Sequence, residues 1–407
     1  MSMAIKEEKK MPQLAVVQTG GSSAVINSTL AGVIRGAQTA GWKVWGYPNA
    51  FEGLLKEKKF LLSELTDVEL RRLRDTPGAF LGSSRLFLTP EIFAEIPRRL
   101  VQQGMDALLM IGGNGTMFAA NKLQAIAREA ALPLRVIGVP KTVDNDLEGM
   151  EYAPGFGSAA RYIAQAVLDI GVDLEAMKTF EQVRIIEVMG RSAGWLAAAS
   201  ALAKRGEAFA PHLIYLPEQA FDEEQFLQEI KAVYERYGFA AAVVGEGIHT
   251  ADGTPVGKLP FAELKAGSQI YGGASAYLAD QVSQKLGLRA RCQDLTMAQR
   301  SFAPLRSPVD EKLAYTVGRS AVQALAEGAS GCMVGCKINV PGYYTLPLEQ
   351  VGGKEKCVPE KFYDLEHKMV TKQFMQWLQP IVGPWSCNYL NLSELDAEKT
   401  QPCKRLV

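Results

Sequence analysis

The chain has 407 residues, of which 47% are hydrophobic and 22% are charged, and its formal net charge is zero. This composition is ordinary for a soluble globular protein, and at roughly 150 residues per domain the length predicts about two domains. A zero net charge gives no general attraction to nucleic acid or to an anionic membrane, so we expect neither as a partner. A small anionic substrate needs only a local cluster of cations.

Two further features predict a cytoplasmic protein. No apolar run reaches the ~18 residues of a transmembrane helix, and the N-terminal MSMAIKEEKKMPQ lacks the apolar centre of a secretion signal. The six cysteines are scattered through the C-terminal third, and we expect free thiols in a reducing compartment. Cys332 and Cys336 lie four residues apart, but no second pair has zinc-finger spacing.

Short apolar strands alternate with helical stretches along the chain. The first predicted strand, Leu14–Gln18, runs into a glycine turn and then into apolar residues at helical spacing. A strand at 107–111 runs through GGNGT into a helix from Met117, and a strand at 135–139 runs into PKTVDND. Further strands are predicted at 183–188, 212–216 and 241–245, with Asp222 as N-cap of the helix after the second of these.

This alternation predicts an α/β fold with parallel sheets covered on both faces. Gly- and Pro-rich segments at 152–158 and 301–310 are candidate domain breaks, and a helical stretch resumes after the second. In open α/β sheets ligands bind at the carboxyl ends of the strands. Two sheets facing each other across a cleft would therefore bring the polar clusters at their strand ends together.

Two glycine-rich turns between a strand and a helix are candidate phosphate sites. They are TGGSS, with Gly20 and Gly21, and GGNGT, from Gly112 to Thr116. Glycines let backbone N–H groups approach an anion, and the helix N-terminus adds positive potential. Each turn is weak evidence alone, because such turns are common, and neither matches the lysine-containing P-loop or the dinucleotide-binding spacing.

The segment PKTVDND places Lys141, Asp144 and Asp146 at the tip of a buried strand. Two aspartates there could simply be turn or capping residues. A cation beside the carboxylates favours a site where a phosphoryl group and a proton both move. Asp144 could act as general base, since that role needs only hydrogen-bond reach and an ionised carboxylate.

Several arginines could bind phosphate. Arg191 follows a strand in EVMGR, where it is either an exposed surface residue or a clamp on a transferring phosphoryl group. Arg85 in FLGSSR is a second candidate clamp, and Glu246 in GEG could accept hydrogen bonds from sugar hydroxyls. The segment RARCQDLTMAQR contributes Arg289, Arg291 and Arg300. These three could bind a sugar phosphate or form a solvated face.

Taken in order, TGG, FLGSSR, GGNGT, PKTVDND, PGFGSAARYI, EVMGR, GEG and QR resemble the phosphofructokinase family. The match runs from Gly20 to about Arg300 and continues more weakly through SPVDEKLAYTVG. Eight motifs in the right order are far more specific than any glycine turn. The resemblance implies two Rossmann-like α/β domains facing an active-site cleft. It also implies a glycolytic reaction, the Mg²⁺-dependent transfer of a phosphoryl group to the 1-hydroxyl of fructose 6-phosphate, in a homodimer or homotetramer.

The resemblance implies a role for each matching residue. Asp144 would deprotonate the attacking hydroxyl, with Asp146 supporting it, and Lys141, Thr142 and Arg191 would stabilise the transferring group. The implied donor-phosphate-binding residues are Gly20, Gly21, Arg85, Gly112, Gly113, Asn114, Gly115 and Thr116. The implied substrate-binding residues are Thr142, Asp144, Met189, Gly190, Arg191, Glu246, Arg291 and Arg300. A neighbouring subunit often contributes to the 6-phosphate site of the last two, and the implied metal residues are Asn114 and Asp144.

The implied domains are discontinuous. Residues 1–155 plus about 308–345 would bind the donor phosphates. Residues 156–307 plus about 346–407 would bind the sugar phosphate. The segment KCVPEKFYDLEHKMVTKQF carries no functional signal in the sequence.

The phosphoryl donor is where the sequence departs from the family pattern. Asn114 and Lys141 match the bacterial pyrophosphate-using branch, whereas Gly115 stands where that branch usually has an aspartate and where ATP users have glycine. Some ATP-using members of the family also pair a lysine at the position of Lys141 with a glycine at the position of Gly115. An aspartate there would repel the ATP α-phosphate. We expect pyrophosphate as donor, with ATP as the alternative. The common histidine or tyrosine three residues before Arg300 is Met297, which predicts an altered sugar-phosphate pocket.

Two functions from other classes are also consistent with parts of the pattern. A non-catalytic regulatory subunit of a phosphofructokinase assembly has no chemical need for Asp144, Asp146, Lys141 and Arg191. Lipid and NAD kinases share a GGDGT-type turn but lack the PKTVDND and MGR pair. A transferase is therefore the favoured reading.

Overall fold

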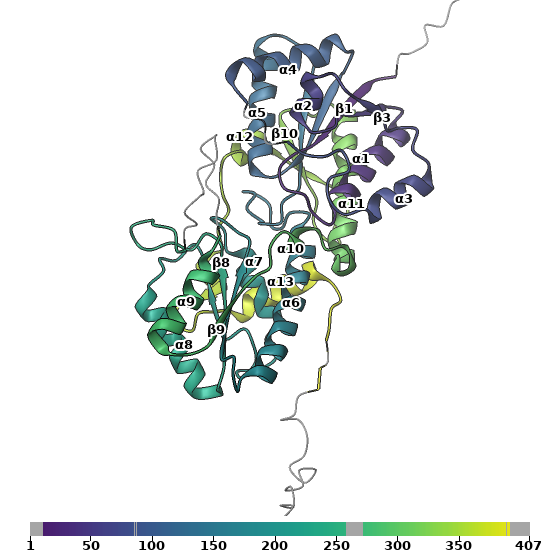
Figure 1. The fold of residues 1–407 in the computed structure, drawn as a ribbon. Helices are drawn as coiled ribbons and strands as arrows, with labels where there is room; N and C mark the ends of the chain where they lie inside the picture. Colours follow the sequence, from purple (N-terminus) through teal and green to yellow (C-terminus); the bar gives the residue numbers. More distant parts are fainter. Residues whose placement is uncertain (1–10, 85, 87, 258–271, 388, 391–407) are drawn as a thin grey trace, which may run out of the picture.

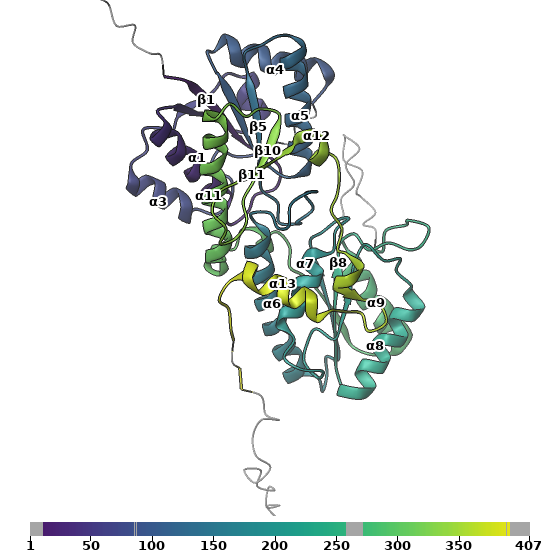
Figure 2. The same cartoon turned by 180° about the vertical axis from the view of Figure 1, so that it is seen from behind.

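Two sheets organise the part of the chain described in this computed structural model, which covers residues 11–84, 86, 88–257, 272–387 and 389–390. The first sheet has the order β11-β10-β5-β4-β1-β2-β3 and the second β7-β8-β6-β9. Figure 1 and, from behind, Figure 2 show one lobe built around each sheet. Apart from the edge pairs β10–β11 and β2–β3, neighbouring strands of both sheets run parallel.

The strands of the first sheet are β1 (Gln13–Gln18), β2 (Lys43–Gly46), β3 (Phe60–Leu61), β4 (Ala107–Gly112), β5 (Arg135–Pro140), β10 (Cys332–Gly335) and β11 (Tyr344–Pro347). Those of the second are β6 (Val183–Val188), β7 (Leu213–Tyr215), β8 (Ala240–Gly245) and β9 (Ala290–Asp294). A separate hairpin is formed by β12 (Tyr363–Asp364) and β13 (Met369–Val370).

The helices around the first sheet are α1 (Ile26–Ala40), α2 (Phe51–Leu55), α3 (Asp67–Asp75), α4 (Pro90–Gln102), α5 (Asn114–Glu129), α11 (Pro308–Ala326) and α12 (Leu348–Val351). The second lobe contains α6 (Phe156–Met177), α7 (Trp195–Ala199), α8 (Glu223–Tyr237), α9 (Ala274–Leu286), α10 (Ala298–Ser301) and α13 (Lys372–Val382). Short 3₁₀ helices are η1 (Ser200–Ala203), η2 (Ala303–Leu305) and η3 (Glu360–Phe362).

The predicted α/β class is confirmed, and each of the six predicted strands is present. Strands such as β4 and β8 are buried along their whole length, which is why they read as uninterrupted apolar runs. The predicted N-cap is also confirmed, because the Asp222 carboxylate accepts a hydrogen bond of 2.9 Å from Gln225 N at the start of α8. The other strands were not predicted from the sequence; β9, for example, is an edge strand whose residues are mostly exposed.

One predicted boundary is wrong. The helix after GGNGT begins at Asn114 and not at Met117, so Asn114 to Thr116 form its first turn. Glycine has low helix propensity, which is why Gly115 reads as part of a loop. The proposed division of the whole chain into domains stays a prediction.

No helix in the described ranges is long and apolar enough to cross a membrane. The cysteines within those ranges are free thiols, as predicted: Cys292, Cys332, Cys336, Cys357 and Cys387.

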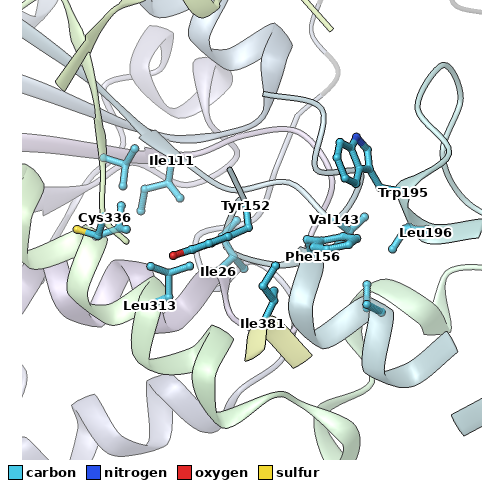
Figure 3. Packing of buried hydrophobic residues seen from close by; sticks show 14 of the residues in the cluster. Ile26, Ile111, Val143, Tyr152, Phe156, Trp195, Leu196, Leu313, Cys336 and Ile381 are labelled. Atoms are coloured by element: carbon cyan, nitrogen blue, oxygen red, sulfur yellow. The ribbon is translucent and has the colours of Figure 1, made fainter. Parts of the chain in front are cut away.

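The two lobes share one hydrophobic core. Figure 3 shows part of it, in which Val143 and Phe156 lie near Trp195 and Leu196 of α7. The Phe156 and Trp195 rings meet edge to face with centroids 6.4 Å apart. Ile26 of α1 belongs to the same cluster. Because this packing is continuous, groups at the ends of the two sheets are held in a defined relation.

A buried carboxylate fastens α11 to α6. Asp310, in the first turn of α11, accepts hydrogen bonds of 2.9 Å from Gly155 N, 2.9 Å from Ser158 N and 2.6 Å from Ser158 Oγ. Replacing Asp310 with alanine should lower the free energy of unfolding by about 3 kcal/mol, because buried N–H groups at the start of α6 lose their partner. Urea denaturation of the two proteins measures the difference.

Asp222→Ala provides the comparison for Asp310→Ala, since it removes an exposed N-cap, with an expected loss of about 1 kcal/mol. If Asp310→Ala is no more destabilising than Asp222→Ala, the buried carboxylate does not have the structural role assigned to it.

Candidate active site

The order of the first sheet places three polar turns side by side. β5, β4 and β1 are neighbours, so the residues that follow them meet at one edge. Lys141 N donates to Gly112 O at 2.9 Å, and the hydroxyls of Thr19 and Thr116 are hydrogen-bonded to each other. A Cβ built at Gly113 would lie 3.5 Å from Thr142 Cβ. The two glycine turns and PKTVDND therefore form one continuous surface.

Lys141 supplies a buried cation to this surface. Its ammonium donates hydrogen bonds to the carbonyls of Gly21 and, at 3.3 Å, Thr19. Burial lowers the pKa of Lys141 to about 8, an effect that the negative charge of Asp144 opposes. Arg300 approaches from α10, since a Cβ at Gly21 would lie 3.6 Å from Arg300 Nη1. Two cations thus lie beside the first glycine turn.

The segment 141–147, here called the catalytic loop, is held by its own side chains. Thr142 Oγ1 donates to Asp146 Oδ1 at 3.0 Å and accepts from Asp144 N at 3.1 Å. Asn145 between the aspartates is fully buried, has a φ of 53°, and accepts from Ala153 N at 2.9 Å. Asparagine tolerates this left-handed conformation, so an asparagine between the two aspartates is itself a sequence signal for this turn. The loop is thereby fixed with Asp144 at its tip.

Asp144 has the environment of a general base. Its Oδ1 is inaccessible to solvent and makes no hydrogen bond to any of the described residues. The pKa of Asp144 is raised to about 6, mainly by burial and next by the negative charge of Asp146, while the positive charges of Arg191 and Lys141 act in the opposite direction. A carboxylate with this pKa is ionised at neutral pH and is a stronger base than an exposed aspartate.

The second lobe contributes residues from the ends of β6 and β8, which are neighbours. Glu246 N donates to Val188 O at 2.8 Å, and the Gly190 N–H donates to the Glu246 carboxylate. Only glycine fits at Gly247, because a Cβ there would lie 1.6 Å from Arg191 O. The strand order thus explains why MGR and GEG lie together although they are far apart in sequence.

The clusters of the two lobes lie within electrostatic range of each other. Arg191 lowers the pKa of Asp144 and of Asp146. The pKa of Glu246 is raised to about 7, mainly by burial and next by the charge of Asp144. The structure therefore brings the exposed Arg191 guanidinium and the carboxylates of Asp144 and Glu246 together at the junction of the lobes.

Comparison with known proteins identifies the family. The family model described as "Phosphofructokinase" matches residues 13–325. The chain belongs to the phosphofructokinase family. This phosphofructokinase is 37% identical over 376 residues to a protein named sulfofructose kinase from Alkalicoccus urumqiensis, covering 91% of this chain and 95% of that one. It is 36% identical over 383 residues to a protein named pyrophosphate–fructose 6-phosphate 1-phosphotransferase from Xanthomonas campestris pv. campestris, covering 91% of each.

A solved structure shows the same architecture. The crystal structure of a pyrophosphate-dependent phosphofructokinase from Marinobacter aquaeolei has a TM-score of 0.82 at 30% sequence identity, with 94% of each chain covered. The predicted family and its fold, two α/β domains with parallel sheets, are thus confirmed.

Some predicted site residues of this phosphofructokinase lie elsewhere in the chain's own fold. Arg291 pairs in β9 with Arg184, near the start of β6, whereas the site lies at the other end of that strand. Its Nε donates to Glu181 Oε1 at 2.9 Å. Arg291 is therefore not brought to the catalytic loop of its own chain. Arg85, the predicted donor clamp, lies outside the described residues.

Asn114 and Gly115 lie in the first turn of α5. The Asn114 carboxamide accepts from Gly353 N at 2.7 Å and donates to Lys354 O at 2.5 Å. Gly115 is exposed, its φ is not positive, and a Cβ there would have nothing within 4 Å. Any side chain at 115 would therefore point into open space at a helix N-terminus.

Sequence reasoning missed two residues that support the site. Gln299, next to Arg300, accepts from Met189 N at 3.0 Å and so connects α10 to the loop of Arg191. Lys356 N donates to Asp146 O at 2.9 Å, which brings the C-terminal region to the catalytic loop. Gln299 belongs to the QR motif, in which only Arg300 was predicted to have a role, and Lys356 lies in a segment without a recognisable pattern.

Proposed function

We propose that this phosphofructokinase family member transfers a phosphoryl group from pyrophosphate to the 1-hydroxyl of fructose 6-phosphate, giving fructose 1,6-bisphosphate. The observation that carries the proposal is the Asp144 carboxylate, whose buried Oδ1 bonds none of the described residues and which lies within electrostatic range of Lys141 and of Arg191 of the other lobe. A base flanked by cations is what proton removal and phosphoryl transfer at one point require. A non-catalytic subunit would have no use for it.

Each lobe supplies one part of the proposed reaction. Donor phosphates would bind at the glycine turns and at the N-terminus of α5, whose first N–H groups have no intrahelical partner. Asp144 would take the proton of the sugar hydroxyl. Arg191, Thr142 and Lys141 would stabilise the negative charge on the transferring group. Glu246, with Met189 and Gly190, would hold the sugar.

A divalent cation fits the site in one specific way. Within the described ranges, no three His, Cys, Asp or Glu side chains gather as a metal site. Mg²⁺ commonly binds through one or two carboxylates together with substrate phosphates. The Oδ1 of Asp144, which bonds no residue in the described ranges, suits this. The Asn114 oxygen accepts from Gly353 N and has a second lone pair. When bound, Mg²⁺ would neutralise charge on the donor phosphates.

The donor is tested by turnover with pyrophosphate and with ATP at a fixed concentration of fructose 6-phosphate. Lys141 supports pyrophosphate and Gly115 keeps ATP as the alternative. Turnover only with ATP would overturn the donor assignment and leave the family unchanged.

Gly115→Asp should separate the two donors. If pyrophosphate is the donor, its turnover should stay within about threefold, while any ATP turnover should fall at least about tenfold, because a new carboxylate would face the α-phosphate. The fold should tolerate the change, since a Cβ at 115 meets nothing within 4 Å and an acidic residue is favourable in the first turn of a helix. Steady-state kinetics with each donor measure the effect.

Gly115→Asn is the matched control, because it adds nearly the same volume without charge. Equal losses with both donors in both variants would show that residue 115 does not discriminate between donors.

A second acceptor is worth testing, because one relative is named sulfofructose kinase. In this chain Met297, which is half exposed, stands where the family commonly has a histidine or tyrosine beside Arg300. A sulfonate carries a single negative charge, less than a phosphate monoester at pH 7, and so needs fewer donors. Comparing kcat/KM for fructose 6-phosphate and for sulfofructose shows which of the two is the better acceptor. A higher kcat/KM for sulfofructose would make it the acceptor in place of fructose 6-phosphate.

We also propose a cytoplasmic homodimer or homotetramer. The exposed Arg291 would then reach the 6-phosphate site of a neighbouring copy, since it lies away from the site of its own chain. Sedimentation or light scattering gives the assembly size.

A further inference from the structure

A short segment near the C-terminus, residues 353–358, runs across the junction of the two lobes. It begins at the N-terminus of α5, where Gly353 and Lys354 are bonded to both polar atoms of the Asn114 side chain. Glu355 then forms an isolated antiparallel bridge with Leu147. The segment therefore starts at the proposed donor site and continues along the catalytic loop.

Lys356 is the centre of this segment. Its backbone N donates to Asp146 O at 2.9 Å, and its ammonium donates to Met150 O at 2.7 Å and Glu151 O at 3.0 Å. The same ammonium lies 4.8 Å from the centroid of the Trp195 ring, and Trp195 Nε1 donates to Lys356 O at 2.8 Å. One residue thus contacts the catalytic loop at Asp146, the backbone just after this loop at Met150 and Glu151, and the first residue of α7.

The far end of the segment fastens the loop of Arg191. Glu218 Oε1 accepts from Val358 N and from Gly194 N, each at 2.8 Å. Gly194 directly precedes Trp195, whose ring packs in the core shared by the lobes (Figure 3). The loop between β6 and α7 is therefore tied to the segment at two neighbouring points.

We propose that Lys356 is a positioning residue for phosphoryl transfer: by bonding the catalytic loop and α7 at once, it fixes the position of Asp144 relative to Arg191. This inference rests on the proposed function of the site. Lys356 itself contacts backbone carbonyls and an aromatic ring, and it acts through the loops that it joins.

A lysine suits this position for two reasons. Its ammonium donates to the carbonyls of Met150 and Glu151, and an apolar side chain could make neither bond. It also balances charge, since Asp146, Glu148 and Glu151 all stabilise its protonated form while burial opposes it. Glu355 adds another negative charge that acts on Asp146.

The chain contains a matched control. Lys204 is also a largely buried lysine whose ammonium donates to backbone carbonyls. Its acceptors are Glu207 O at 3.3 Å, Phe209 O at 3.1 Å and Pro211 O at 3.0 Å. Pro211 lies just before the start of β7, at the amino end of this strand, whereas the site lies at the carboxyl ends of the strands. Lys204→Met and Lys356→Met therefore make the same chemical change at two distances from Asp144.

Kinetics of both variants test the role. Lys356→Met should lower kcat about 10–100-fold, because small displacements of reacting groups reduce rates by up to about that factor, while KM for fructose 6-phosphate changes less than about threefold. Lys204→Met should keep kcat within about twofold, and Lys356→Arg should recover part of the lost rate. Comparable kcat losses in both methionine variants would show that Lys356 contributes only to stability, and this would overturn the proposal.

Amide hydrogen exchange provides a readout that needs no turnover. Exchange in residues 144–151 should be faster in Lys356→Met than in the wild type, and unchanged in Lys204→Met. Unchanged exchange there in Lys356→Met would overturn the proposal even if kcat falls. If the wild-type protein turns over neither donor, the proposed function fails, and the exchange comparison alone decides whether Lys356 positions the loop. Should Lys356→Met not fold, Trp195→Phe, which removes the bond to Lys356 O, is examined in the same way.

Discussion

Replacing Asp144 with asparagine should lower kcat by a factor of about 10²–10⁴, with only a modest change in KM for fructose 6-phosphate. Asparagine keeps the size of the side chain and its place at the tip of the catalytic loop but cannot accept the proton of the attacking hydroxyl. In the proposed function, sugar binding depends on other groups, among them Glu246 and Arg300. Steady-state kinetics with the productive donor measure both constants, and near-normal turnover would show that Asp144 is not the base.

Thermal melting of the same variant excludes a folding defect. Because the pKa of Asp144 is raised to about 6 in the folded protein, its contribution to stability is present below the ordinary pKa of an aspartate and is lost as the pH rises through about 6. At pH 8 the ionised carboxylate therefore opposes folding, and Asp144→Asn should melt no lower than the wild type. A fall in kcat with an unchanged or higher melting temperature would assign the loss to chemistry.

The pH dependence of the wild type gives an independent check. The value of kcat/KM should fall as the pH drops from about 7 to below 6, where Glu246 and Asp144 become protonated. Because these two carboxyl groups interact, the fall in kcat/KM reports the titration of the pair and not of either residue alone. Rates that stay constant down to pH 5 would contradict an essential carboxylate with a raised pKa.

The sequence was sufficient for those parts of the fold and site that depend on local pattern. Strands that are buried on both faces appear as continuous apolar runs in the sequence, and the turns after them carry the polar residues. The sequence therefore predicted that the site lies at the carboxyl ends of the strands. Lys141, Asp144 and Asp146 lie within six positions of one another. Their common environment could therefore be predicted before any strand order was known.

Contacts between distant segments could not be predicted in this way. Lys356 bonds Asp146 across more than two hundred residues, and its surroundings in the sequence show neither periodicity nor a motif. The resemblance placed Arg291 near the sugar phosphate. In the structure Arg291 pairs with Arg184 near the amino end of β6, whereas the site lies at the carboxyl end of that strand. The start of α5 was missed because Gly115 weakens the helical pattern.

Lys141→Met is expected to have the second large effect, a loss in kcat of about 10²–10³. Of the three N–H donors of the Lys141 ammonium, two bond the carbonyls of Thr19 and Gly21 within the described part of the chain. This places the charge at the first glycine turn, where a donor phosphate would bind. Charge on the donor and leaving group grows in the transition state, so the loss should appear mainly in kcat. KM for fructose 6-phosphate should change less than about threefold.

The pKa of Lys141 makes the same prediction testable in the unaltered protein. Burial lowers this pKa to about 8, so the wild-type rate should fall as the pH rises above about 8, because the ammonium loses its charge. Lys141→Met should lack this alkaline limb in its residual activity. Lys204→Met again serves as control, because burial also lowers the pKa of Lys204 to about 8. The Lys204 ammonium bonds carbonyls that precede β7, away from the carboxyl ends of the strands that form the site. A Lys141→Met variant that binds fructose 6-phosphate more weakly at normal kcat would instead assign Lys141 to the sugar, because a charge felt equally in the bound and transition states changes KM alone.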